Sequence, residues 1–164
     1  MPVFAAVFFR TADGWTGTEV ELADLDGIDD VADAMRDAAA ASDGDGTAVV
    51  LVAEADDEWF GIVRLDDADE PRPFLSDLRA VHSHPAARLF LESDRLAASD
   101  DEIEGTGQTP YPEPVGDSEL LADLGTPGEE LLALTQREGV LPADALTTVA
   151  DRAGFAAALD ELRA

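Results

Sequence analysis

The only two histidines of the chain stand two residues apart, in the segment His82-Ser83-His84-Pro85. Two imidazoles at this spacing can bind zinc if a carboxylate completes the ligand set. A nearby glutamate could then act as the general base of a hydrolase. One hypothesis for function is therefore a small metal-dependent enzyme that uses His82 and His84.

The residues after this segment decide whether the zinc site is complete. Metal-dependent deubiquitinase-like proteases carry His-Ser/Thr-His-Pro, then seven residues, then Ser-x-x-Asp. Ser93 stands at the matching distance, but Leu96 occupies the aspartate position and Asp94 comes two residues early. The segment before His82 also has the pattern of a helix, where the protease motif would follow a strand. Because the third ligand is missing, we assign no metal ligand and no catalytic residue, and we interpret both histidines as residues of a helix or of its last turn.

Carboxylates gather in four short stretches that could suggest a Ca²⁺ or Mg²⁺ site. Such ions need several oxygens that converge on one point, and none of the stretches fits the EF-hand pattern. With 37 acidic residues in a chain of 164, clusters arise by chance, so we interpret them as solvated loops. The stretches are Asp24/Asp26/Asp29/Asp30, Asp43/Asp45, Asp66/Asp67/Asp69/Glu70 and Asp100/Asp101/Glu102/Glu104.

The net charge is the most unusual property of the chain. The 37 acidic residues face 10 basic ones, all of them arginine, which gives a formal charge of -27. Such a surface repels phosphates, so direct binding of nucleic acid or of an anionic membrane is not expected. The charge would attract a basic partner or keep the protein in solution at high salt. The simpler explanation, which we favour, is a bias of the whole composition towards Ala, Asp and Arg.

Several classes of protein are excluded by what the chain lacks. It has no cysteine, hence no disulfide and no thiolate chemistry. No apolar run approaches the ~20 residues of a spanning helix, and the first residues do not resemble a signal peptide. We expect a cytoplasmic protein without a cofactor; the sequence does not indicate its oligomeric state.

The fold is organised around residues 48–65. Two apolar runs, Ala48–Ala53 and Trp59–Leu65, flank an acidic tip, Glu54–Glu58, and this pattern predicts an antiparallel hairpin. Both parities of each run are apolar, which predicts strands near the centre of a sheet with both faces covered. The acidic tip is then the part of the hairpin left for a basic partner. The candidate partner-binding residues are Glu54, Asp56, Asp57 and Glu58.

The rest of the first half completes an α+β sheet domain over residues 1–92. Val3–Phe9 and Trp15–Leu22 predict a second hairpin, and Ile28–Ala41 has apolar residues at helical spacing. Pro73–Asp77 predicts a short last strand, followed by a helix over Leu78–Glu92. We expect four or five antiparallel strands with one helix on one face. Trp15 and Trp59 are interpreted as core residues rather than as ligand platforms.

The second half has a different pattern. Residues 93–115 are acidic and contain Pro and Gly, which predicts a loop or linker. Residues 116–164 predict a C-terminal bundle of short helices, with start and stop signals such as Thr126-Pro127-Gly128-Glu129. Whether this bundle packs on the sheet or forms a separate unit stays open. A pocket between sheet and helices would make the protein a small-molecule binding domain, which is a further alternative.

Two blocks of the sequence resemble the actinobacterial family of tRNA adenosine deaminase-associated proteins. The first block runs from Phe4 to Asp37 and continues over Asp57–Asp77, and the second covers Val115–Arg163. The Trp59-Phe60 strand and the segment GVLPADAL with the following RAGF are the most specific parts. Residues 80–114 carry little of the resemblance.

The resemblance implies association with the enzyme that converts adenosine to inosine in tRNA, and not that activity itself. Zinc deaminases need His-x-Glu and Pro-Cys-x-x-Cys. This chain has no cysteine, and neither His82 nor His84 has a glutamate two residues later. We therefore expect a non-catalytic accessory protein whose partner is the deaminase.

Overall fold

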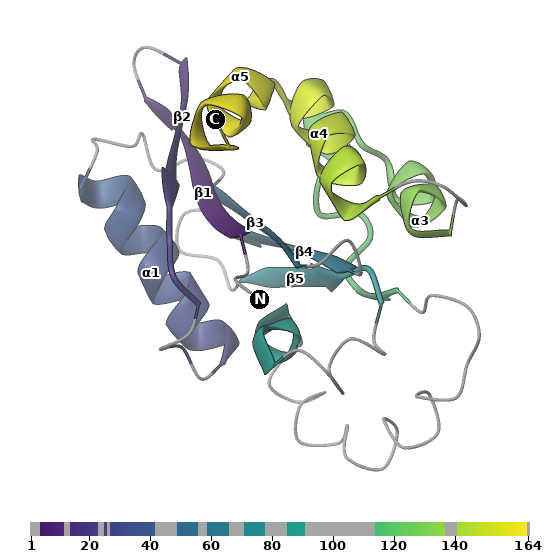
Figure 1. The fold of residues 1–164 in the computed structure, drawn as a ribbon, viewed down its shortest axis with the longest axis horizontal. Coiled ribbons are helices and arrows are strands. Elements are labelled where there is room, and N and C mark those ends of the chain that lie inside the picture. Colours follow the sequence, from purple (N-terminus) through teal and green to yellow (C-terminus); the bar gives the residue numbers. More distant parts are fainter. Residues whose placement is uncertain are drawn as a thin grey trace.

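The structure is a computed structural model that describes ten stretches of the chain: residues 4–11, 14–22, 25, 27–41, 49–55, 59–65, 71–77, 85–90, 114–136 and 141–163. These residues form three layers, with a β-sheet between helices on both of its faces (Figure 1). The expected α+β class is confirmed. Within the described residues, no helix combines the length and the apolar character needed to cross a bilayer.

The sheet has six strands in the order β2-β1-β3-β4-β5-β6, and every neighbouring pair is antiparallel. Every described residue of β4 is buried, as expected for a strand covered on both faces. The central hairpin is thus confirmed, with each of its strands inside the sheet. The strands are β1 (Phe4–Thr11), β2 (Gly14–Glu19), β3 (Val49–Ala55), β4 (Trp59–Leu65), β5 (Arg72–Leu75) and β6 (Val115–Gly116).

The sixth strand, β6, is one more than the four or five expected. It contains only Val115 and Gly116, and two residues are too few to show the alternating pattern of a strand. The sequence pattern therefore places Val115 in the predicted linker. The backbone N–H of Asp117 continues the pairing by donating to the carbonyl of Pro73 at 2.9 Å. Gly116 has a φ of 103°, and a Cβ there would lie 2.9 Å from the Cα of Phe74. A glycine therefore lets this strand approach β5 so closely.

One face of the sheet is covered by α1 (Ile28–Ala41) and by the 3-10 helix η2 (Pro85–Phe90). The apolar stripe of α1 is buried as expected: Ile28, Val31, Ala32, Met35 and Ala39. Phe90 lies edge-on to Trp59, with ring centroids 5.7 Å apart. Its ring packs over Gly61 of β4, where a Cβ would come within 2.6 Å. The expected helix over Leu78–Glu92 is thus seen only in this 3-10 part; residues 78–84 and 91–92 lie outside the described residues.

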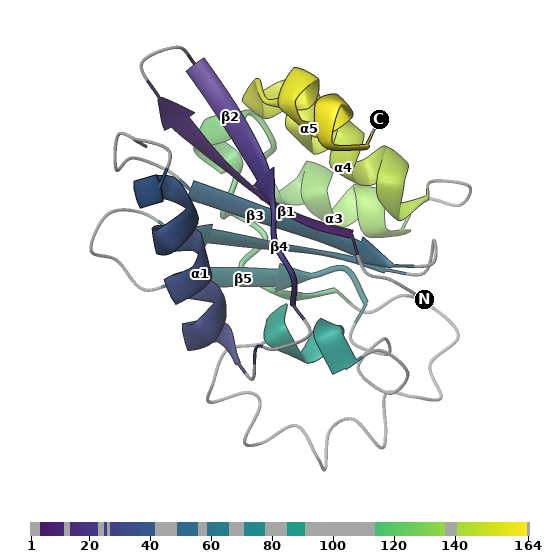
Figure 2. The same ribbon diagram turned by 60° about the vertical axis from the view of Figure 1, so that its left-hand side comes forward.

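The opposite face is covered by the C-terminal segments, which the sequence left unplaced. They are the 3-10 helix η3 (Ala122–Leu124), α3 (Gly128–Gln136), α4 (Pro142–Ala153) and α5 (Ala156–Arg163). Leu131, Leu146 and Leu159 of the three α-helices are fully buried in one core with the side chains of this sheet face. Figures 1 and 2 show these helices and α1 on opposite sides of the sheet.

Two details of the start signals differ from expectation. The hydroxyl of Thr126, expected to cap α3, is buried and has no hydrogen-bond partner among the described residues. Ser76, which with Asp77 is one of the two residues that could cap the helix expected from Leu78, accepts a hydrogen bond from the backbone N–H of Phe60 at 2.9 Å and so extends the sheet. By contrast, Pro142 opens α4 and Gly154 ends it with a φ of 104°, the positions at which proline and glycine favour the start and the end of a helix.

Candidate functional site: two paired arginines on the sheet

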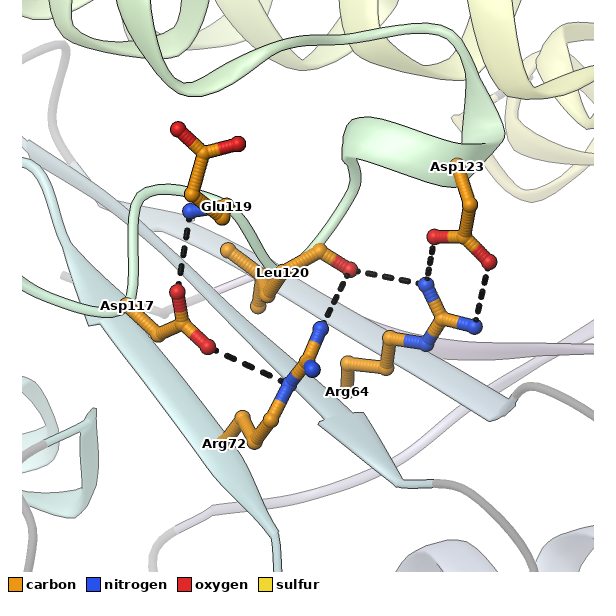
Figure 3. Close-up of polar contacts among 6 residues, drawn as sticks. All are labelled: Arg64, Arg72, Asp117, Glu119, Leu120 and Asp123. Carbon is orange, nitrogen blue, oxygen red and sulfur yellow. Dashed lines mark hydrogen bonds and ion pairs between the residues drawn. The ribbon is translucent and has the colours of Figure 1, made fainter.

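A cluster of buried and half-buried polar groups on the sheet is built around Arg64 of β4 and Arg72 of β5. The two residues are direct partners in the antiparallel register. Arg64 shares its parity with Phe60 and Ile62, whose side chains face the C-terminal helices. Because register partners project from the same face, both guanidinium groups lie under the segment that leads from β6 into η3 (Figure 3).

Arg64 forms the more buried half of the pair. Its side chain is 8% exposed, and its Nη1 donates to the carbonyl oxygen of Leu120 at 2.9 Å. The same guanidinium makes a two-pronged contact with the carboxylate of Asp123, with Nη2 2.9 Å from Oδ2 and Nη1 bonded to Oδ1. This fork geometry is the strong form of an arginine–carboxylate pair. A charge on a central strand is thus matched by an opposite charge, as burial requires.

Arg72 reaches the same loop from the neighbouring strand. Its Nη2 donates to the same carbonyl of Leu120 at 3.0 Å, and its Nε lies 3.2 Å from Oδ2 of Asp117. The other oxygen of Asp117 accepts a hydrogen bond from the backbone N–H of Glu119 at 2.9 Å. Asp117 therefore shapes its own loop and also neutralises Arg72. The carbonyl oxygen of Leu120 thus accepts a hydrogen bond from each of the two arginines (Figure 3).

The electrostatics of the cluster are dominated by Arg64. Its hydrogen bond holds the pKa of the Asp123 carboxyl below the ordinary value, and the charges of Arg64 and Arg72 act in the same direction. Partial burial of Asp123 opposes them. The carboxylate is therefore ionised well below neutral pH and remains paired with the guanidinium there.

A third arginine, Arg152 of α4, ties the C-terminal elements to one another. It forms an ion pair with Glu130 of α3. Its Nη1 also lies 3.4 Å from the carbonyl oxygen of Gly125, at the end of η3. Gly125 has a φ of 103°, and a Cβ there would come within 2.9 Å of the carbonyl oxygen of Arg152. Arginines thus join the loop both to the sheet and to the helices.

This cluster is built to hold the C-terminal layer on the sheet. The guanidinium groups of Arg64 and Arg72 already contact carboxylates and a carbonyl. The cluster contains no hydroxyl, thiol or imidazole side chain; its six residues are Arg64, Arg72, Asp117, Glu119, Leu120 and Asp123. In the part of the chain that the structure describes, no group of three or more His, Cys, Asp or Glu side chains could hold a metal ion. We therefore interpret the paired arginines as a positioning element.

The acidic tip of the central hairpin is shorter than the sequence suggests. Glu54 is not in the turn but in β3, paired in register with Phe4 and Phe60, and its side chain is half-buried. Because Val50 and Val52 have the same parity and belong to the core under the C-terminal helices, Glu54 projects from that face. Asp56, Asp57 and Glu58, which join β3 to β4, lie outside the described residues.

Other candidates fall largely beyond what the structure describes. His82 and His84 lie outside it, as do Ser93, Leu96 and most of the four acidic stretches. Asp29 and Asp30 are exposed in the first turn of α1. Trp59 is fully buried in the core, whereas Trp15 is half-buried, with Arg10 5.0 Å over its ring.

Exposed carboxylates occur on both helical layers. The outward side of α1 carries Asp29, Asp30, Asp33 and Asp37, and the one arginine there, Arg36, lies 3.3 Å from Asp33. The acids of the opposite layer are Glu119, Asp123, Glu129, Glu130, Asp144, Asp151, Asp160 and Glu161. Both outer surfaces are therefore acidic over the described residues.

The fold and this cluster define a class of protein: an α+β domain whose antiparallel sheet is covered on both faces and pinned to its C-terminal helices by arginines. A family model described as Rv3753c-like tRNA adenosine deaminase-associated protein matches residues 3–156, and the chain belongs to this family. The match confirms the resemblance stated from the sequence. Searches of curated proteins and of solved structures gave no match.

The arginine cluster was not predicted, although the sequence holds a signal for it. Arg64 interrupts the apolar run Trp59–Leu65, and Arg72 opens the next strand. A charged residue in a strand that is buried on both faces needs a partner. The acids Asp117 and Asp123 are the partners, but only the register of β4 with β5 and the path of the chain after β6 bring them together.

Proposed function

We propose that this protein is a non-catalytic accessory protein that binds tRNA adenosine deaminase through its acidic surface. The observation that carries the proposal is membership of a family whose description names association with that enzyme. The net charge of -27 supports it, because an enzyme that binds tRNA must present a basic surface. Opposite charges on two partners accelerate their encounter and select the partner.

The polar groups described on the sheet serve the packing of the C-terminal layer, and the chain lacks the cysteines of a zinc deaminase. The cluster of Arg64 and Arg72 is engaged in holding the loop, and the described part of the chain offers no metal-binding group. The zinc ligands of a deaminase would include cysteine, which the chain lacks. A role in restraining or stabilising the enzyme follows more naturally than a second chemical step.

The docking surface that we propose includes the end of the central hairpin at Asp56, Asp57 and Glu58. Glu54 belongs to β3 and is half-buried, so its contribution would be smaller. The experiment is a pull-down with the deaminase at ~50 mM and ~500 mM salt, since the higher salt shortens the screening length to a few ångströms. We expect retention at low salt and loss at high salt. No retention at low salt would contradict the proposal.

A matched pair of variants separates the hairpin tip from net charge. Reversal of Asp56, Asp57 and Glu58 to arginine changes the charge by the same amount as reversal of Asp37, Asp151 and Asp160. The control residues are exposed and spread over α1, α4 and α5. We expect the tip variant to lose the deaminase and the control to weaken it slightly. Equal losses would leave only unspecific steering and would clear the tip of this role.

A further inference from the structure

The long outer edge of the sheet, at β2, has a row of backbone hydrogen-bonding groups that no other described residue pairs with. β2 is the last strand of the sheet on its side, and six of its residues pair with β1 in one unbroken register (Figure 2). The opposite edge, β6, has only two residues. Natural proteins shorten, bulge or cover an edge strand to avoid pairing with other chains. β6 is short, whereas β2 has neither proline nor a bulge.

The alternation of the ladder identifies the free groups. Val20 donates its N–H to the carbonyl of Ala5 at 3.0 Å, and this pair continues the β1–β2 register. In an antiparallel ladder such hydrogen-bonded pairs alternate with pairs whose backbone N–H and C=O groups point away from the partner strand. The backbone N–H and C=O groups of Trp15, Gly17 and Glu19 therefore point outward. Among the described residues, none pairs with them.

The surroundings of this edge favour a positively charged segment. Glu19 and Glu21 are exposed at one end of β2. Helix α5 packs against β2, where its Leu162 lies beside Gly17, and the exposed Glu161 precedes Leu162 in this helix. The one arginine on the strand pair, Arg10, is exposed and stacks on Trp15. A second copy of this chain would also carry a net charge of -27. The repulsion between the two copies disfavours self-pairing at low salt.

We propose that the β2 edge binds an extended, Lys- or Arg-rich segment of a protein partner by addition of a strand. The main chain of the segment would pair with Trp15, Gly17 and Glu19, and its basic side chains would lie beside Glu19. Strand addition draws affinity from main-chain hydrogen bonds and specificity from alternate side chains. This inference goes beyond the proposed function, because it holds for any partner that carries such a segment.

Two variants at one position separate hydrogen bonding from charge. Glu19→Pro removes an outward N–H without touching the ladder to β1, and edge strands tolerate proline at such positions. Glu19→Gln removes the charge and keeps the N–H. The probe is a fluorescent seven-residue peptide that alternates Lys with Thr and Val, and a second peptide is N-methylated on the amides that would face β2. Binding is followed by anisotropy at low salt.

The inference predicts that Glu19→Pro and the N-methylated peptide each lower the affinity by roughly tenfold. Glu19→Gln should lower it less, and circular dichroism should show both variants folded. Equal affinity for the two peptides would overturn the inference, since binding would then be only electrostatic. Dimers in sedimentation that grow with salt and vanish in Glu19→Pro would also overturn it, because a second copy would occupy the edge.

Discussion

Arg64 and Arg72 lie opposite each other on neighbouring strands, and both donate to the carbonyl oxygen of Leu120. Two like charges side by side on a sheet destabilise it unless acids compensate them. Here Asp117, directly after β6, and Asp123 of η3, six residues further along the chain, provide that compensation. The loop that starts the C-terminal layer is thus attached to the sheet at two points.

Replacement of Arg64 should destabilise the fold strongly. Arg64→Ala removes the paired contact with Asp123 and one hydrogen bond to Leu120, so we expect a loss of about 2 to 3 kcal/mol in the free energy of unfolding. Arg36→Ala is the matched control, because Arg36 is half-exposed and has only an ion pair with Asp33. Its loss should stay within about 0.5 kcal/mol. Urea unfolding measures both, and equal losses would contradict the anchoring role of Arg64.

The Arg64–Asp123 pair should also make the free energy of unfolding depend on pH in the acid range. The pKa of Asp123 is lower in the folded protein than in the unfolded chain. The contribution of the Asp123 carboxylate to the free energy of unfolding is therefore complete at a pH above its pKa in the unfolded chain. It is lost as the pH falls through its pKa in the folded protein. We expect the wild type to be more stable than Asp123→Asn at pH 7 and the gap to close at the acid end of the titration. A gap independent of pH would show that Asp123 acts without its charge.

Gly116 should tolerate no side chain. Gly116→Ala would force a positive φ on alanine and press its Cβ against Pro73 and Phe74. We expect a loss of about 3 kcal/mol, from about 1 to 2 for the backbone and the rest for overpacking. Gly14 has a similar φ of 117° but open space around it, so Gly14→Ala should show the backbone cost alone. Thermal unfolding of the two variants gives the comparison, and equal losses would remove the close approach of β6 from the account.

Phe155 should be a major contact between the helices and the sheet. Its ring stacks on that of Phe8, with the ring centroids 4.5 Å apart, and its centroid lies 5.3 Å from that of Trp15. Phe155→Ala should cost about 3 to 5 kcal/mol and shift the fluorescence of Trp15 to longer wavelength. Leu141→Ala, at a large apolar side chain that is 46% exposed, should change neither. A small loss at Phe155 would mean that the C-terminal layer is held without this core.

The parts of the fold that were predictable are those with a repeated local pattern. The runs around Trp59 are apolar at both parities, and Ile28–Ala41 repeats at helical spacing, so local sequence sufficed. β6 has two residues and depends on a contact with Pro73, far away in the chain. In the same way, Arg64 lies 59 residues from Asp123, and no local pattern connects them.

The position of Glu54 shows a limit of another kind. An acidic residue beside Asp56 and Asp57 has the composition of a turn, but the register with Phe4 and Phe60 keeps it in β3. The low strand propensity of one glutamate is outweighed by the pairing of the whole strand β3 with both of its neighbours. Three residues, Asp56, Asp57 and Glu58, therefore connect β3 to β4, and the docking proposal depends mainly on them.

The most direct test of the account is titration calorimetry of this protein with tRNA adenosine deaminase over a range of salt concentrations. We expect heat of binding at ~50 mM salt and an affinity that falls steeply towards ~500 mM, because the attraction is between an acidic and a basic surface. The arginine variant of Asp56, Asp57 and Glu58 should bind far more weakly, and the variant of Asp37, Asp151 and Asp160 nearly as well as the wild type. No binding at the lowest salt, or an affinity that does not change with salt, would contradict the proposed function.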